Sequence, residues 1–485
     1  MNYKMMGRFL SLILIAEGIF MIPALAISMV DGTPHVTRAF LITLGIILAV
    51  AGLLLLITRR ASKRFFAKEG LFCVGLSWLV MSLFGCLPFC LSGEIPSYID
   101  ALFEMVSGFT TTGASVVRDV EALSRGTLYW RSFSHWVGGM GVLVFLLAIV
   151  PMSGKNDGFT MHLLRAESPG PNVEKLVPKM RQTAAVLYVT YFVLTVLNVV
   201  FLLLGGVSFF ESICTAFGTA GTGGFGIKND SMASYMPYVQ GVCTVFMLLF
   251  GINFGCFYLL ILRQIREVFR DEELRFYLGI VIGSIVIITL NIRGLYQTVG
   301  EALRHAAFQV SSIITTTGFA TVDFDLWPSL SKGILLILMM IGACAGSTGG
   351  GLKCIRVLLI LKGVRRSLAQ MLHPQKVQVI RVNEHPISEK IVANTNAYIC
   401  VYFLIMMLSF LLISVDGFSI MTNFSAVVSC INNIGPGLEA VGPTCNFADY
   451  GVFSKIVLIL DMLAGRLEIF PILALFSLRT WKPTR

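Results

Sequence analysis

The sequence predicts an all-α membrane protein in which two N-terminal helices precede four repeats, each made of an outer helix, a re-entrant pore loop and an inner helix. Composition is the first reason. Of the 485 residues, 56% are hydrophobic and 13% are charged, which leaves too little polar surface to cover a soluble globule. The second reason is a string of residues that recurs between long apolar stretches. The four repeats are expected to surround a pseudo-fourfold central pore.

Ten apolar stretches approach the roughly 20 residues that a helix needs to cross a bilayer. They lie at about residues 8–29, 39–58, 72–91, 132–152, 183–205, 238–262, 277–292, 333–360, 393–415 and 451–478. Basic residues gather in alternate connections between these stretches, which is the pattern of cytoplasmic loops. The cytoplasmic segments are then the N-terminus, 59–68, 155–181, 263–275, 353–390 and the C-terminal tail. We therefore predict a multi-pass protein of the cell inner membrane with both termini cytoplasmic and no nucleic-acid partner.

An internal repeat divides the chain. The segments Ala101–Gly113 (ALFEMVSGFTTTG) and Ala306–Gly318 (AAFQVSSIITTTG) are identical at seven of thirteen positions. Weaker copies stand at Gly221–Gly224 and Asn432–Gly435, each between two apolar stretches. Just before these strings lie apolar segments that are too short to span a bilayer and are predicted to be re-entrant half-helices, at 98–110, 207–219, 300–314 and 420–431.

The repeats give a division of the whole chain. We predict two leading helices in 1–68, followed by repeat 1 in 69–155, repeat 2 in 156–265, repeat 3 with a broken inner helix in 266–370, and repeat 4 in 371–485.

The four recurring strings suit a binding site for a bare monovalent cation. A potassium ion leaves water only where a ring of oxygens replaces its hydration shell, and main-chain carbonyls from several loops supply such a ring. Glycine allows the positive φ that turns successive carbonyls to one side. The predicted potassium-binding residues are Thr111, Thr112, Gly113, Thr222, Gly223, Gly224, Thr316, Thr317, Gly318, Asn433, Ile434 and Gly435. Potassium is here the substrate, and no covalently bound cofactor is expected.

Charges near the loops favour a cation. Each half-helix is expected to point its C-terminus, the negative end of its dipole, at the central axis. Acidic residues that follow the loops are expected to enrich cations at the outer mouth. These acids are Asp119, Asp230, Asp323, Asp325 and Glu439.

The eighth apolar stretch contains a run of glycines that a continuous helix cannot accommodate, so the helix is predicted to break beneath the loops, where the irregular segment can close the pore. The predicted gate comprises Gly346, Ser347, Thr348, Gly349, Gly350, Gly351 and Arg466. Arg466 lies within the tenth stretch and needs a partner there. Two interpretations stay open for it: a structural pair with Glu468 or another helix, or a charge near the pore that repels cations or anchors the glycine-rich loop.

Together these features resemble the Trk/Ktr/HKT superfamily of potassium transport proteins, and specifically the TrkH type with its two extra N-terminal helices. The resemblance covers nearly the whole chain. Besides the four strings, it rests on Trp130-Arg131, Trp136–Gly141, Ala345–Lys353 and Gly465–Glu468.

The resemblance implies potassium uptake through a homodimer with one pore per protomer, regulated by a cytoplasmic nucleotide-binding subunit of the TrkA type. It also implies that residues 342–351 form the gate and that Arg466 is paired with them. Family members with serine at the first filter position favour sodium, whereas Gly113 resembles the potassium-selective pattern. The fourth loop, with Asn432, Asn433 and Pro436, departs from Thr-Thr-Thr-Gly as TrkH-type loops do.

The sequence disfavours two other classes of protein. An alternating-access symporter coupled to sodium or protons would be built from inverted repeats, whereas the two strong copies here are 205 residues apart and run in the same orientation. A membrane-embedded enzyme would need clustered carboxylates, a serine and histidine pair, or metal ligands. The six histidines and eleven cysteines are dispersed, so no enzyme is predicted.

Overall fold

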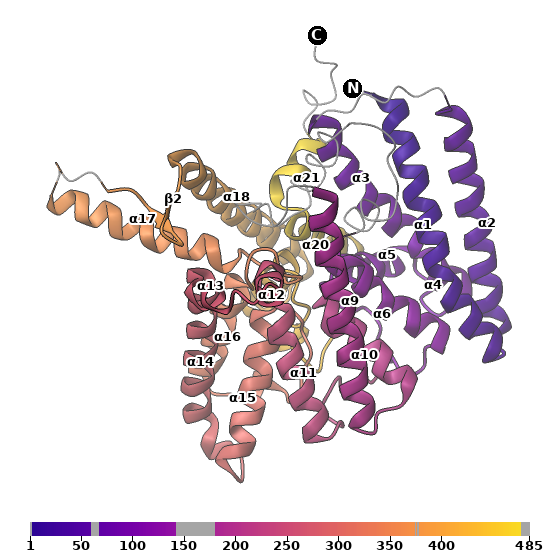
Figure 1. Cartoon of the computed structure of the whole chain (residues 1–485). Helices are drawn as coiled ribbons and strands as arrows, with labels where there is room; N and C mark the ends of the chain where they lie inside the picture. Colours follow the sequence, from indigo (N-terminus) through magenta and orange to yellow (C-terminus); the bar gives the residue numbers. More distant parts are fainter. Residues whose placement is uncertain (1, 60–66, 142–179, 374, 376–377, 477–485) are drawn as a thin grey trace.

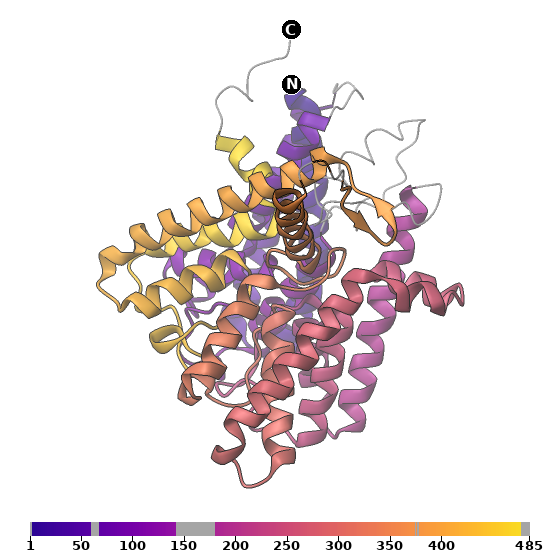
Figure 2. The ribbon, with the colours of Figure 1, turned by 90° about the vertical axis from the view of Figure 1, so that its left-hand side faces the viewer.

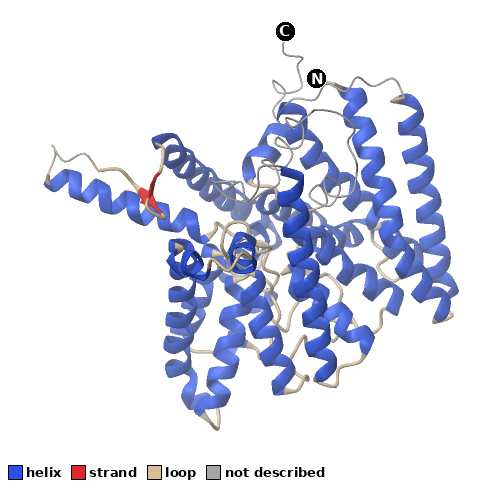
Figure 3. Ribbon diagram, in the orientation of Figure 1, coloured by secondary structure: helices blue, strands red, loops and turns tan. Residues whose placement is uncertain are grey.

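The computed structural model describes residues 2–59, 67–141, 180–373, 375 and 378–476. Within these ranges the regular secondary structure is almost entirely helical (Figure 3), as predicted. The strands in this part of the chain are β1 (Arg381–Val382) and β2 (His385–Pro386), which form one antiparallel hairpin. The predicted cytoplasmic segments 59–68 and 155–181 lie largely outside the described residues.

Two long helices, α1 (Tyr3–Val30) and α2 (Pro34–Ile57), pack side by side at one edge of the molecule (Figure 1). The turn between them ends at Pro34, which suits the first turn of α2 because the N–H that proline lacks has no helical partner there. Figures 1 and 2 place α17 (Cys354–Leu372) at the opposite edge. The start of α1 and the last described helix, α21 (Ile469–Phe476), lie at the same end of the molecule.

Four short helices stand at the predicted half-helix positions: α5 (Tyr98–Phe109), α10 (Phe209–Gly221), α15 (Val299–Ile314) and α19 (Ile420–Ile431). Each begins after a serine or threonine whose side chain accepts a hydrogen bond from the backbone N–H three residues on, so the first turn is capped. The capping residues are Ser97, Ser208, Thr298 and Ser419.

Each short helix lies in the chain between an outer and an inner helix. The outer helices are α3 (Ala67–Gly85) with its continuation α4 (Leu87–Ser92), α9 (Met180–Leu204), α14 (Glu272–Ile292) and α18 (Glu389–Ile413). The inner helices are α6 (Arg125–Met140), α11 (Pro237–Phe250), α16 (Ser329–Ile341) and α20 (Val452–Arg466). This order confirms the predicted helical architecture, while the residue boundaries of the repeats stay a prediction.

The junction of α3 and α4 shows how a helix break is satisfied inside this fold. The carbonyl of Gly85, at the end of α3, accepts the indole Nε1–H of Trp130 at 2.9 Å. Trp130 is fully buried, and its ring centre lies 6.0 Å from that of Phe109.

Six helical stretches among the described residues are long and apolar enough to cross a membrane, and a seventh is formed if two bent segments count as one. Several of the ten predicted apolar stretches are therefore not continuous helices within the described residues. The stretch 333–360 breaks, as expected, at residues 342–353, and the stretch 132–152 continues beyond the described residues.

Two further breaks were not predicted. The stretch 238–262 bends by 91° between α11 and α12 (Phe254–Ile261), where Asn253 caps the second segment by accepting from Gly255 N at 2.8 Å. The stretch 451–478 breaks after Arg466, where Glu468 adopts a left-handed φ of 57°. Three inner helices, α6, α11 and α20, end near the C-termini of short helices, where Gly138, Gly251 and Gly465 each approach a residue. After α16, it is Gly349 in the glycine-rich run that approaches such a residue, Thr315.

Candidate functional site

The loops that follow the four short helices share one backbone conformation. In each loop a main-chain N–H reaches back to the carbonyl five residues earlier, on the small residue that ends the last helical turn. The pairs are Thr112 with Ser107 at 2.8 Å, Gly223 with Gly218 at 2.9 Å, Thr317 with Ser312 at 2.8 Å and Ile434 with Ser429 at 3.0 Å. The fourth loop, which differs most in sequence, therefore has the same geometry as the other three.

Each loop has left-handed backbone at two alternate residues. The first has a side chain, with φ of 55° at Thr111, 53° at Thr222, 59° at Thr316 and 56° at Asn433. The second is the predicted glycine, with φ of 82° at Gly113, 73° at Gly224, 85° at Gly318 and 102° at Gly435. Left-handed threonine is costly, so the surrounding contacts must hold it there. The alternation turns successive carbonyls to one side of the strand, as expected for an oxygen-lined path.

The four glycines close a ring of contacts. A Cβ atom on Gly113 would collide with the carbonyl oxygen of Gly223 in the second loop. The same relation links Gly224 to Thr317, Gly318 to Ile434, and Gly435 to Thr112, which returns to the first loop. Each glycine therefore packs directly on the main chain of the next loop, and no side chain fits between them. The predicted filter residues lie together around a common centre.

Hydroxyl and amide groups brace the ring. In the first and third loops, paired threonine hydroxyls are 2.8 Å apart, between Thr110 and Thr112 and between Thr315 and Thr317. In the fourth loop the amide of Asn433 makes the bracing hydrogen bonds. Its Nδ2 donates to Thr112 Oγ1 at 3.0 Å and to the Met462 carbonyl at 2.9 Å. The departure of the fourth loop from Thr-Thr-Thr-Gly thus supplies a link between the fourth and first repeats.

A cavity of about 130 Å³ lies on one side of the ring and is lined by all four filter glycines. Its lining includes the cations Arg118, Arg131 and Lys228, whereas the acids predicted to gather at the mouth lie outside the lining. For Glu439, hydrogen bonds from Ser419 and then Thr422 hold the pKa of the carboxyl below its usual value. Any enrichment of cations by these acids therefore acts from outside the cavity.

The glycine-rich run contacts the ring from the side of the inner-helix breaks. The N–H of Gly350 donates to Thr316 Oγ1 at 2.6 Å, and Gly349 packs on the carbonyl of Thr315. Gly342, Gly346 and Gly351 have φ of 75°, 70° and 77°, so the chain needs glycine to turn here. The predicted gate segment therefore lies directly against the predicted filter.

The unpredicted break between α11 and α12 holds the glycine-rich run from one side. Main-chain hydrogen bonds join Cys344 N to Gly251 O at 3.1 Å and Phe254 N to Gly346 O at 3.0 Å, and Thr348 Oγ1 donates to Phe250 O at 3.2 Å. The sequence signal for this break was Gly251 and Asn253 inside an apolar stretch.

Arg466 holds the run from the other side. Its guanidinium donates to the carbonyl of Thr348 at 2.8 Å and to the carbonyls of Gly138 and Gly139 at the end of α6. Glu468, one of the partners considered for it, forms an ion pair with Arg356 of α17. This geometry favours the anchoring interpretation, since one side chain joins the fourth inner helix, the first inner helix and the glycine-rich run.

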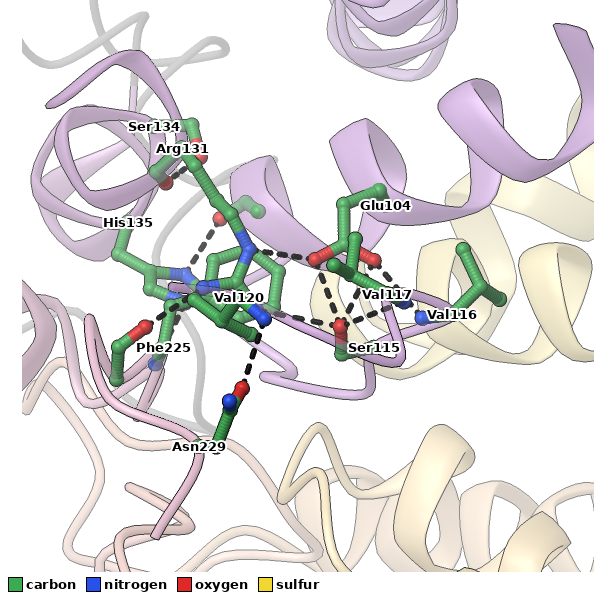
Figure 4. A network of polar contacts seen from close by, with 12 residues as sticks. Glu104, Ser115, Val116, Val117, Val120, Arg131, Ser134, His135, Phe225 and Asn229 are labelled. Atoms are coloured by element: carbon green, nitrogen blue, oxygen red, sulfur yellow. Dashed lines mark hydrogen bonds and ion pairs between the residues drawn. The ribbon is translucent and has the colours of Figure 1, made fainter. Parts of the chain in front are cut away.

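A buried polar network beside the first two loops was missed by sequence reasoning (Figure 4). Arg131 forms an ion pair with Glu104, donates to the Gly226 carbonyl at 2.8 Å, and stacks 3.6 Å from the ring centre of Phe225. Glu104 also accepts from Ser115 Oγ at 3.0 Å and from Val116 N at 2.9 Å. Both charged side chains are at most 3% exposed. The network fixes the segments that leave the first and second loops.

His135 links the same two loops. Its Nδ1 lies 2.8 Å from the carbonyl of Gly108, and its Nε2 accepts from the N–H of Phe225 at 3.2 Å. Since Nε2 accepts, the proton lies on Nδ1, which donates to Gly108. His135 therefore joins the end of α5 to the chain just after Gly224.

Comparisons with known proteins agree with these features. A family model for TrkH, described as a cation transport protein, matches residues 36–482. The chain is 36% identical to the Trk system potassium uptake protein TrkH of Salmonella typhimurium, over 99% of this chain and 100% of that protein. It is 32% identical to TrkG of Escherichia coli, over 91% of each. The crystal structure of the potassium transporter TrkH from Vibrio parahaemolyticus superposes with a TM-score of 0.88 at 30% identity, covering 99% of this chain and 100% of that one.

The buried ion pair yields a stability prediction. Glu104→Gln keeps the shape of the side chain but leaves Arg131 without its counter-charge, and breaking a buried pair costs about 3–5 kcal/mol. We expect a clearly lower midpoint of thermal unfolding in detergent. The control is Asp449→Asn, which removes the partner of Arg118 in an ion pair whose side chains are 73% and 68% exposed, and which should change the midpoint little. Equal midpoints for Glu104→Gln and the unchanged protein would contradict the bracing role.

Proposed function

Because the chain belongs to the TrkH family of cation transport proteins, we propose that it takes up potassium ions through the ring of four loops. The family consists of transporters, and the chain is not an enzyme. Relatives that match it along nearly their whole length are named for potassium uptake. The observation that carries the proposal is the closed set of contacts in which each filter glycine packs on the main chain of the next loop.

The mechanism follows from what main-chain oxygens offer a cation. In the proposal, carbonyls of the twelve residues at 111–113, 222–224, 316–318 and 433–435 replace the hydration shell of potassium as it enters the ring. The short helices end at the loops, so their negative dipole ends favour a cation and disfavour an anion. The left-handed residues hold the strands so that the oxygens need no rearrangement when an ion arrives.

Gating is assigned to the glycine-rich run. Residues 346–351 lie against the ring and are held by Arg466 and by the break after α11, so in the proposal they obstruct the path in this conformation. Opening requires the run to leave the ring, which its glycines permit because they can adopt several backbone conformations at low cost. The cationic side chain of Arg466 adds an electrostatic barrier at the same place.

The assembly and location are part of the proposal. We place the protein in the cell inner membrane with both termini cytoplasmic, which the alternation of basic connections and the position of α1 and α21 at one end support. The homodimer and the cytoplasmic TrkA-type nucleotide-binding subunit follow from the family resemblance.

Ion flux into liposomes tests the proposal directly. Purified protein should admit potassium and rubidium and admit sodium more slowly, and single-protein recordings in a bilayer should show unitary currents far above the turnover of a transporter. Strict coupling of potassium to sodium or protons without such currents would contradict a pore and favour the alternating-access symporter.

The filter assignment predicts the effect of a side chain on the ring. Gly113→Ser or Gly318→Ser must displace the neighbouring carbonyl and should lower the preference for potassium over sodium by about tenfold, equivalent to roughly 1.4 kcal/mol. The measurement is the ratio of initial flux rates. Gly206→Ser is the matched control, because Gly206 has φ of 77° but no atom within 4 Å of the added Cβ, so it adds backbone strain without a collision. Unchanged selectivity in both filter variants would count against the assignment.

The gate assignment predicts a gain of flux. Deletion of part of residues 346–351 should raise basal potassium flux in the absence of any regulatory subunit, because the obstruction is removed. The potassium-to-sodium ratio serves as the internal control, since the filter residues are kept. Basal flux equal to that of the intact protein would remove the gating role from this segment.

A further inference from the structure

One side chain, Glu273 in the first turn of α14, contacts the chain on both sides of the proposed gate residues 346–351. The N–H of Ala345, just before Gly346, donates to Glu273 Oε1 at 2.7 Å. The N–H of Ile355, in the first turn of α17, donates to the same oxygen at 3.1 Å. Residues 346–354, a nine-residue segment that contains the proposed gate, therefore lie between two N–H groups bound to one carboxylate oxygen.

Glu273 caps the N-terminus of α17, which has no side-chain cap from its own N-cap residue. Lys353, which precedes α17, gives no side-chain hydrogen bond to the first turn, and its φ of 75° shows that the chain enters the helix by a sharp turn. The first N–H groups of a helix have no internal partner and carry partial positive charge, so a carboxylate from another helix stabilises them. Glu273 gives this acceptor to Ile355.

The β1–β2 hairpin helps to fix the position of Glu273, because Asn383 in its turn bonds to the two residues that precede Glu273. Asn383, in the turn of the hairpin, donates to Asp271 Oδ2 at 2.8 Å and accepts from Glu272 N at 2.8 Å. Asp271 in turn caps α14 by accepting from Leu274 N at 2.7 Å. Glu273 is 5% exposed and projects inward from this braced turn, so it provides a rigid support rather than a mobile contact.

Contacts within the run show what depends on that support. Lys353 lies between the two clasped ends, and its ammonium donates to the carbonyl of Gly349. Gly349 lies against Thr315, and Gly350 contacts Thr316, Asn432 and Asn433. Displacement of Ala345 and Ile355 therefore acts on these two glycines through Lys353.

We propose that Glu273 is a positioning residue that clasps both ends of the glycine-rich run and thereby sets its resting place against the filter. The assignment rests on the proposed gating role of the run. Glu273 acts through the run and does not touch the permeating ion.

Two readouts on the full-length protein test this inference. Hydrogen exchange of the peptide that covers 342–356 reports whether the run is held, and basal potassium flux in liposomes reports whether it obstructs the path. Glu273→Ala should speed exchange in that peptide by about tenfold, because the hydrogen bonds from Ala345 and Ile355 are lost, and should raise basal flux. Glu273→Gln keeps an oxygen that accepts from both N–H groups and should restore most of the protection and the low flux.

Glu272→Ala is the matched control, because the neighbouring carboxylate pairs with Lys362 and makes no contact with the run in the described structure. Both readouts should stay as in the unchanged protein. If Glu273→Ala fails to insert, Glu273→Gln and Glu273→Asp are compared instead. The shorter side chain of the Asp variant cannot reach both Ala345 and Ile355. Faster exchange at 342–356 and raised flux in that variant would therefore support the clasp.

The outcomes distinguish a failure of the Glu273 inference from a failure of the gating proposal. The Glu273 inference would be overturned by unchanged exchange at 342–356 in Glu273→Ala. It would also be overturned if exchange increased without increased flux while the deletion within 346–351 raised flux. Both results leave the gating proposal intact. Increased exchange in Glu273→Ala, with flux unchanged both there and in the deletion, would instead reject the gating proposal.

Discussion

The structure depends on direct contact between main chains at the centre of four repeats. Each filter glycine lies so close to a carbonyl of the next loop that hydrogen is the only side chain that fits, and the contacts pass from the first loop through the second, third and fourth back to the first. This closeness brings oxygens from four separate segments into one ring. It also explains why the loops tolerate left-handed threonine and asparagine, since the helix ends, the paired hydroxyls and Asn433 hold the strained residues in place.

Around the ring, hydrogen bonds join the inner helices to one another. They are made by backbone groups that lose their helical partners at the breaks. Helix breaks at membrane depth expose N–H and C=O groups that cannot reach water cheaply. Here the groups freed after α11 bond to the glycine-rich run, and the carbonyls at the end of α6 and at Thr348 accept from Arg466. The breaks thus satisfy each other, and together they build the assembly that is proposed to gate the ring. Movement of one inner helix must change the hydrogen bonds of its neighbours.

Local sequence was enough to place the four short helices within two residues of where they lie, because in each case a short apolar segment precedes a recurring string that ends in glycine. The break after α11 was missed because mean hydropathy stays high across Gly251 and Asn253, and the break after Arg466 because Glu468 alone gives little signal. The long-range partners were beyond reach: nothing near Glu104 in the sequence indicates Arg131, and nothing near Glu273 indicates Ala345 and Ile355. Such pairs are set by how the repeats pack, which one sequence does not reveal.

The central claim is that main-chain oxygens of the four loops hold a bare monovalent cation. The most direct measurement is a structure determined with thallium or rubidium in place of potassium, with the heavy cation located by anomalous scattering. The account predicts peaks on the axis between the carbonyls of Thr112, Gly223, Thr317 and Ile434. Peaks confined to other parts of the molecule, with none inside the ring, would contradict it.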